Sequence, residues 1–388
     1  MRRIAVLVLL ALFVAAPARA QYEILQGFED LAPVGPDKAL GIVIWNHGLL
    51  GQTDQGALPP PLYLRALHAA GWDLIRIKRN GLYESGGWAN AGQRHVARTV
   101  EEVARVKAQG YKRVVLAGQS YGGAITLETA RKTDVYAIIP SAPGTGVSLQ
   151  ELGSVLANAQ GSQQLYAALA DGRFERAVAI LPFSDEYASG SPERGTRSRE
   201  TMAKRNVPYL PLDEQSTLLL SHGASSTPLM AFAYAQCLVA FLDPNTPRAN
   251  GLAKCGADGL PPSPDLLAET AALKPATLPN DGWLKFYEGI WVGAWSDPLL
   301  VSVTLEKAAS GYELVYLYGK PRSAELGRTY RVPAALEGRD IKAELPHQSI
   351  TLEFDQKTKQ VVLKWSNKEG RSNSTKLRKL DRAPAAAS

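Results

Sequence analysis

Short apolar runs alternate with helix-like stretches over residues 41–242, and this alternation limits the fold more than any other feature of the chain. Strands that are apolar throughout and are separated by helices predict a mostly parallel sheet with helices on both faces. We therefore expect an α/β domain over residues 21–242. Its predicted strands are 41–45, 72–78, 113–117, 135–140, 177–182 and 207–212, its predicted helices are 62–70, 94–109, 123–131, 193–205 and 228–242, and a helical insertion is predicted at 149–169.

The pattern changes after residue 242. Residues 243–282 contain seven prolines and several glycines, which indicates a linker. Beyond it, apolar and polar residues alternate with period two between turn residues, as is typical of antiparallel strands. We expect a small antiparallel β-barrel or sandwich over residues 283–388. Its predicted strands are 290–295, 300–306, 312–318, 350–354 and 361–365.

The first twenty residues have the pattern of a signal peptide. Arg2 and Arg3 precede an apolar run, and the stretch ends in Ala18, Arg19 and Ala20, a small-x-small cleavage site. We predict removal of residues 1–20 and a periplasmic or secreted mature protein. The apolar run is shorter than the ~20 residues that span a bilayer, and no later segment is long enough, so the mature chain is predicted to lack a transmembrane segment.

The chain contains two cysteines, Cys237 and Cys255. Export to an oxidising compartment favours a disulfide between them, and their spacing closes one short loop. Two cysteines without a nearby histidine make a poor zinc site. We therefore predict the disulfide and no metal.

Charge excludes some partners and leaves one open. The mature chain carries 40 basic and 37 acidic side chains, which is too small an excess for a nucleic-acid binder. Residues 283–388 carry 17 basic and 12 acidic side chains, whereas residues 21–282 carry 23 and 25. The basic β-domain could contact an anionic polymer or lipid head group, or its charge could simply keep it soluble.

The sharpest chemical signal is the run Gly118-Gln119-Ser120-Tyr121-Gly122, which follows an apolar strand and precedes a helix. A serine at a turn between strand and helix, in a G-x-S-x-G context, predicts a nucleophile elbow. Gly118 and Gly122 relieve the crowding at such a turn because they have no side chain. Ser120 is therefore the predicted nucleophile.

With this motif the chain resembles the α/β-hydrolase superfamily over residues 38–242, and more loosely its dienelactone-hydrolase-like serine esterases. The resemblance implies an eight-stranded sheet whose first strands are missing or short. It also implies a catalytic triad in the chain order serine, acid, histidine.

A serine needs a base whose pKa lies near neutral pH, which in practice means histidine. His222 follows the last predicted strand of the sheet and precedes the last helix, where the family places its base. We predict that His222 is the base. The other histidines are His47, discussed below, and His68, His95 and His347, which are predicted to be surface or packing residues.

Three carboxylates compete for the acid: Asp185, Glu186 and Asp213. If Asp213 ended the penultimate strand, about four residues would remain for a parallel crossover that needs about 10–12. If instead 177–182 is the penultimate strand, Asp185 lies at its carboxyl end. Asp185 is therefore the predicted acid, Glu186 is the alternative, and Asp213 is predicted to be a loop or capping residue.

One departure from the family pattern concerns the loop before His222. About ten residues separate Leu212 from His222, which is longer than usual, and the apolar run 217–220 could itself be a strand. In that alternative Ser225 and Ser226 occupy the place of an acid, and the triad is incomplete.

An acyl-transfer site also needs two donors for the oxyanion. The backbone N–H of Tyr121 is one candidate, since it lies at the amino end of a helix. The other is Leu49 N–H in the run 45–50, which resembles the family's His-Gly oxyanion loop. Gly48 would permit the turn there, and His47 would shape the loop.

In the β-domain, Trp291 and Trp295 lie on one face of the same predicted strand. Such a pair either fills the core of a small β-domain or stacks on a sugar ring. The segment weakly resembles the opening of a lipocalin-like barrel.

Together these features predict an exported serine hydrolase that cleaves a small carboxylic ester or lactone through an acyl-enzyme and needs no cofactor. The alternative is a non-catalytic surface or glycan-binding protein that uses the hydrolase fold as a scaffold.

Overall fold

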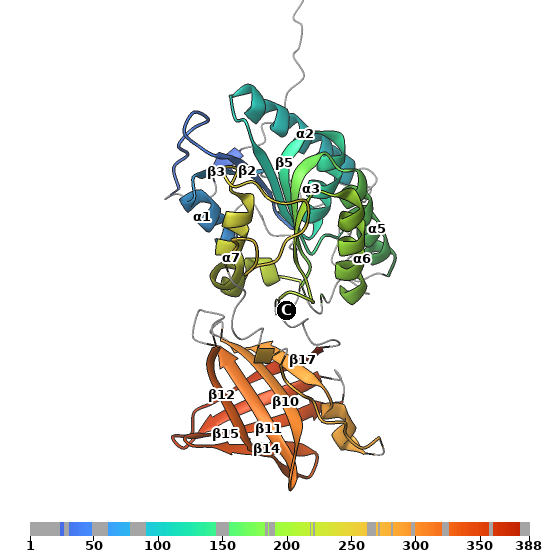
Figure 1. The fold of residues 1–388 in the computed structure, drawn as a ribbon, viewed down its shortest axis with the longest axis vertical. Coiled ribbons are helices and arrows are strands. Elements are labelled where there is room, and N and C mark those ends of the chain that lie inside the picture. Colours follow the sequence, from blue (N-terminus) through green and yellow to red (C-terminus); the bar gives the residue numbers. More distant parts are fainter. Residues whose placement is uncertain are drawn as a thin grey trace, which may run out of the picture.

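The structure is a computed structural model with two parts, an α/β domain and a β-domain (Figure 1). The predicted leader, residues 1–20, lies outside the described residues. The structure describes residues 24–26, 31–48, 61–77, 91–144, 155–182, 185, 191–217, 219, 222–261, 269–270, 272–280, 282–295, 299–319, 326–356 and 360–380.

The α/β domain is built on an eight-stranded sheet with the order β1-β3-β2-β4-β5-β6-β7-β8. β1 pairs antiparallel with β3, and the remaining neighbours pair in parallel. The strands are β1 (Ile24–Gln26), β2 (Gly41–Asn46), β3 (Trp72–Ile77), β4 (Val114–Gln119), β5 (Val135–Ser141), β6 (Phe174–Ile180), β7 (Pro208–Leu212) and β8 (Gly251–Leu252).

Helices cover both faces of this sheet (Figure 1). On one face lie α1 (Leu62–Ala69) and α7 (Pro228–Leu242), whose apolar side chains share a core cluster with Val43 and Val115. The other face, which includes Ile44 and Leu116, is covered by α2 (Gln93–Ala108), α3 (Tyr121–Lys132), α5 (Val155–Asp171) and α6 (Ser191–Arg205).

Neighbouring residues of one strand thus enter opposite cores, which explains why these strands are apolar throughout. The strand order, the short first strand and the helices on both faces are those of the α/β-hydrolase fold, so the predicted fold is confirmed.

One prediction about this domain was wrong in detail. The helix predicted as an insertion at 149–169 is α5, which connects the parallel neighbours β5 and β6 and packs against α3 and α6. It is a crossover helix because a parallel pair requires one. The predicted last strand before His222, 207–212, corresponds to β7, and the described residues of the alternative run 217–220, Thr217 and Leu219, lie outside any strand. β7 is therefore the last long strand before His222.

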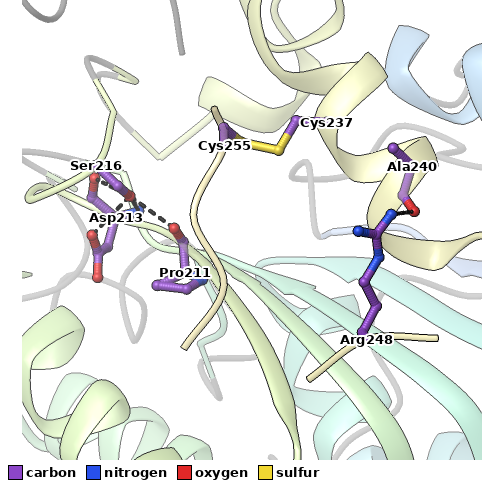
Figure 2. Close-up of a disulfide and its surroundings, with 7 residues drawn as sticks. All are labelled: Pro211, Asp213, Ser216, Cys237, Ala240, Arg248 and Cys255. Atoms are coloured by element: carbon purple, nitrogen blue, oxygen red, sulfur yellow. Dashed lines mark hydrogen bonds between the residues drawn. A yellow bond between two sulfur atoms is a disulfide. The ribbon is translucent and has the colours of Figure 1, made fainter. Parts of the chain in front are cut away.

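The chain after α7 packs back onto the α/β domain. Cys237 on α7 and Cys255 just after β8 form a disulfide, with their Cα atoms 5.7 Å apart (Figure 2). Nearby, Arg248 donates a 2.6 Å hydrogen bond to the Ala240 carbonyl. β8 extends the sheet beside β7, and Leu260 is buried. The first part of the predicted linker is thus held against the edge of the sheet.

The β-domain is one antiparallel nine-stranded sheet with the order β12-β11-β10-β9-β17-β16-β15-β14-β13. The sheet curls until β12 approaches β14, which encloses a separate apolar core. Its strands are β9 (Ile290–Ala294), β10 (Leu300–Ala308), β11 (Gly311–Gly319), β12 (Leu326–Pro333), β13 (Ala335–Glu337), β14 (Asp340–Leu345), β15 (Gln348–Asp355), β16 (Gln360–Asn367) and β17 (Ser372–Leu380).

The outer face of this curled sheet is also apolar where it meets the rest of the chain. Val292, Val315 and Leu317 are buried and belong to the same continuous cluster as α1 and α7. The connecting segment contributes Leu273 to that cluster, and Thr270 Oγ1 lies 2.7 Å from Ser302 Oγ. The two domains therefore share an apolar contact. Among the helices that the structure describes, none combines the length and hydropathy that a membrane span requires.

Candidate active site

Ser120 lies on a tight turn between β4 and α3 and is 2% exposed. Its backbone has φ 55° and ψ −122°, which is a region that side chains with a Cβ rarely adopt. Backbone hydrogen bonds hold this conformation, because Ser120 N–H donates to Ser141 O at 2.9 Å and Ser120 O accepts from Ala124 N and Gly144 N at 3.1 Å. The turn is therefore a strained serine turn of the kind that the motif predicted.

The glycines around this turn are required by space. A Cβ on Gly118 would overlap the Gly122 carbonyl, and a Cβ on Gly122 would overlap the Asn46 carbonyl at the end of β2. A Cβ on Gly48 would approach the Ser120 Cβ to 3.3 Å and overlap the Gln119 side chain. The loop after β2 thus passes directly beside the serine turn.

Asp185 and His222 come together from two neighbouring strand ends. Asp185 follows β6 and His222 follows β7, and His222 Nδ1 lies 2.9 Å from Asp185 Oδ1. The Asp185 side chain is 2% exposed and the His222 side chain is 12% exposed. A buried carboxylate on Nδ1 fixes the ring orientation and leaves Nε2 as the nitrogen that can accept a proton.

Arg194 supports the second oxygen of Asp185 from α6. Its Nη1 lies 3.7 Å from Asp185 Oδ2, and its Nη2 donates a 2.7 Å hydrogen bond to Pro143 O. The guanidinium is buried, which lowers the pKa of Arg194, and the Asp185 charge opposes that change. Sequence reasoning missed this residue, because an arginine in a polar helix carries no sign that it points inward.

Gln119 connects the serine turn to the histidine loop. Its Nε2 donates a 3.2 Å hydrogen bond to the backbone carbonyl of His222. Together with the contacts above, this bond closes a ring of residues around the site, in which each residue contacts the next or is its neighbour in the chain. We call it the site ring. Its members in order are Ser120, Gly144, Pro143, Arg194, Asp185, His222 and Gln119.

The competing acids have different surroundings. Asp213 binds the guanidinium of Arg199 with both oxygens, each at 2.7 Å, and also accepts from Gln215 N–H at 3.1 Å. These bonds give Asp213 a structural role at the end of β7, as expected for a loop or capping residue. Glu186 lies outside the described residues.

The remaining histidines have packing or surface positions. His95 is buried, and its Nδ1 lies 2.8 Å from the Tyr121 hydroxyl. His47 is buried with Nδ1 2.9 Å from Gly48 O, so it lies in the loop that it was expected to shape. His68 Nε2 lies 3.2 Å from Ala32 O, and His347 is exposed. Within the described ranges, no group of three or more acidic, His or Cys side chains could hold a metal ion.

Of the two predicted oxyanion donors, Tyr121 and Leu49, the structure describes only Tyr121. Tyr121 is the first residue of α3, so its backbone N–H lies at the positive end of a helix. Its side chain is buried against His95, with the two rings edge-to-face at 5.7 Å. Leu49 lies outside the described residues. A Cβ added to Gly48 would crowd Ser120, so the described residues just before Leu49 lie beside the serine.

The order of the strands and the helices on both faces of the sheet are those of the α/β-hydrolase fold. No protein family and no curated protein matches the sequence. Among solved structures, an esterase from Pyrococcus furiosus is similar over 53% of this chain and 84% of its own, at 15% identity and TM-score 0.37. A fungal esterase from Rhizomucor miehei is similar over 57% of this chain and 82% of its own, at 14% identity and TM-score 0.40.

A puromycin-hydrolysing peptidase from Mycobacterium tuberculosis is similar over 56% of this chain, at 15% identity and TM-score 0.38, but over only 37% of its own length. Values this low define no activity for the present chain. Its chemistry has to be inferred from its own residues.

Proposed function

We propose that this protein is an exported serine hydrolase that cleaves a carboxylic ester or a lactone, with Ser120 as nucleophile, His222 as base and Asp185 as the acid that orients it. The site ring is the observation that carries the proposal. It connects a strained serine turn to a buried Asp-His pair through contacts among five separate parts of the chain.

In the proposed reaction, Ser120 Oγ attacks the carbonyl carbon of the ester while its proton passes to His222 Nε2. The negative charge moves to the carbonyl oxygen, where the backbone N–H groups of Tyr121 and Leu49 bind it. Each such donor typically contributes about 3–4 kcal/mol to the transition state. Asp185 stabilises the imidazolium that forms.

The intermediate then collapses. The bond to the leaving oxygen breaks, and that oxygen takes the proton from His222, which leaves an ester between the acyl group and Ser120. Water attacks this acyl-enzyme while His222 accepts the water proton, and the carboxylic acid is released as Ser120 is protonated again. The cycle consumes one water molecule and uses no cofactor.

Several finer predictions accompany this proposal. Four of them stay predictions: the resemblance to dienelactone hydrolases, the lipocalin-like character of the β-domain, export directed by residues 1–20, and contact of the basic β-domain with an anionic surface. The non-catalytic scaffold is the competing function, and the same experiment decides between the two.

The test is labelling with a fluorophosphonate probe together with turnover of p-nitrophenyl esters of short and long acids. We expect wild-type protein to be labelled and Ser120→Ala to lose both labelling and turnover. Ser225→Ala is the matched control, because Ser225 is also a buried serine, close to His222 in sequence, and should keep both. Folded wild-type protein that neither reacts with the probe nor turns over any ester would identify a non-catalytic scaffold.

A further inference from the structure

The β-domain contains a cavity of about 340 Å³ that the proposed reaction does not use. We call it the barrel cup. Its volume lies within the range of small-molecule binding pockets. The residues that line it come from one end of the curled sheet, where β9, β11 and β16 end and β10, β15 and β17 begin; they are Trp295, Leu299, Tyr316, Tyr318, Gln348, Trp365 and Asn373.

Hydrogen bonds and ring contacts fix the aromatic side chains of the cup. The indole N–H of Trp295 donates to the Tyr316 hydroxyl at 3.2 Å, and the indole N–H of Trp365 donates to Gln348 Oε1. The Tyr316 and Tyr318 rings lie 5.8 Å apart, and each lies within 6.3 Å of Tyr330. The rings are therefore held in place without a ligand, which reduces the entropy cost of binding.

The cup differs from the core beneath it. Val303, Leu314 and Leu363 fill the core and are fully buried. Trp291 is also buried there and donates to Tyr287 O at 3.1 Å. Trp295 is only half-buried and lines the cup. Trp291 on β9 therefore fills the core, whereas Trp295, just after β9, faces a cavity.

The cup combines aromatic rings with uncharged polar groups. None of the described residues that line it carries a charged side chain. Burial raises the pKa of Tyr316 to about 12. The pKa of Tyr318 is raised mainly by burial and also by the neighbouring Tyr330. Both phenols therefore stay neutral at ordinary pH. Gln348 and Asn373 add amides, which both donate and accept hydrogen bonds.

We propose that the barrel cup binds a neutral sugar ring of a glycan. A pyranose has apolar C–H faces that pack on aromatic rings, and a rim of hydroxyls that donate and accept as the amides and phenols do. An acyl chain would pack on the aromatic rings but has no group that can hydrogen-bond with the amides and phenols. An anionic polymer would find no cation in the described lining. This site is independent of Ser120 and would hold the protein on a glycan.

The experiment uses the full chain with Ser120→Ala, so that no hydrolysis interferes and failure of the proposed reaction does not affect the result. Maltotriose, cellotriose, chitotriose, mannotriose and xylotriose are titrated by calorimetry at up to about 10 mM. We expect at least one to bind with a Kd below about 1 mM. Trp295→Ala should then weaken binding about tenfold, and Asn373→Ala about threefold.

Asn250→Ala is the matched control, because Asn250 is an exposed asparagine in the α/β domain and should leave the Kd unchanged. Asn373 is itself exposed, so its replacement should not affect folding, and the melting temperature checks this for each variant. Absence of binding by all five sugars would overturn the proposal. Binding of decanoate in their place, weakened by Trp295→Ala, would also overturn it by showing an acyl-chain site.

Discussion

The ends of β6 and β7 each carry a buried aspartate that faces an arginine from the same helix, α6, yet the two pairs differ. Asp213 after β7 uses both oxygens on Arg199, at 2.7 Å each. Asp185 after β6 uses one oxygen on His222 at 2.9 Å, and Arg194 lies 3.7 Å from the other.

The difference separates a carboxylate that contacts an imidazole from one that is held by an arginine. A bidentate guanidinium engages both oxygens of a carboxylate and holds it in one orientation. A looser arginine contact leaves one oxygen for an imidazole. We infer that Asp185 serves the reaction and Asp213 serves stability.

The largest expected effects come from replacing each of the two aspartates by asparagine. Asp185→Asn should lower kcat about 10³- to 10⁴-fold while the protein stays folded, because an amide no longer fixes the imidazole tautomer. Asp213→Asn should leave kcat within about threefold and lower the free energy of unfolding by about 3 kcal/mol. Ester turnover and denaturant unfolding measure the two quantities. Equal loss of turnover in both variants would break the comparison.

The arginines sharpen the comparison. Arg199→Met should destabilise the fold by about 3 kcal/mol, since it leaves Asp213 buried without its partner. Arg194→Met should lower kcat about tenfold to a hundredfold by loosening Asp185, so Arg194 is a positioning residue. Arg194→Lys keeps the positive charge but lacks the planar guanidinium, and it should give an intermediate kcat. Unchanged turnover in Arg194→Met, in a folded protein, would remove Arg194 from this role.

Removal of the disulfide changes the edge of the sheet beside β7 without changing the β6 end. Replacement of Cys237 and Cys255 by serine should lower the free energy of unfolding by about 3 kcal/mol, because the cross-link restricts the unfolded chain. Since β8 pairs with β7 and lies away from β6, kcat should stay unchanged. Calorimetry with and without dithiothreitol gives the same comparison in wild-type protein, and an unchanged melting temperature would contradict it.

The smallest effect concerns Glu214, beside Asp213. Burial, and then the Asp213 charge, raise the pKa of Glu214 from its usual 4.5 to about 8. The folded protein therefore keeps this proton while the unfolded chain loses it, so stability is full below pH 4.5 and falls as the pH rises to about 8. We expect a loss of about 2 kcal/mol between pH 5 and 7. In Glu214→Gln this loss should disappear, whereas equal pH profiles would contradict the assignment.

The elements of the α/β domain were predictable because their signals are local. The helix Pro228–Leu242 matches its predicted bounds, and the predicted strands fall on real ones. The turn at Ser120 was predictable because the strand, the motif and the helix are adjacent in sequence. In the β-domain, β12, β13, β14 and β17 were not predicted. Part of the reason is that β12 and β17 carry many polar, exposed residues, which blur the alternation.

By itself, then, the sequence determined the type of fold and the serine turn, together with the topological reason to favour Asp185 over Asp213. Only the tertiary structure decided which arginine faces which aspartate and that Gln119 reaches the His222 loop. Arg194 and Arg199 are alike in sequence and five residues apart on α6, a rise of about 7.5 Å along the helix. The packing of α6 on the sheet places them at different strand ends, and no local pattern encodes that placement.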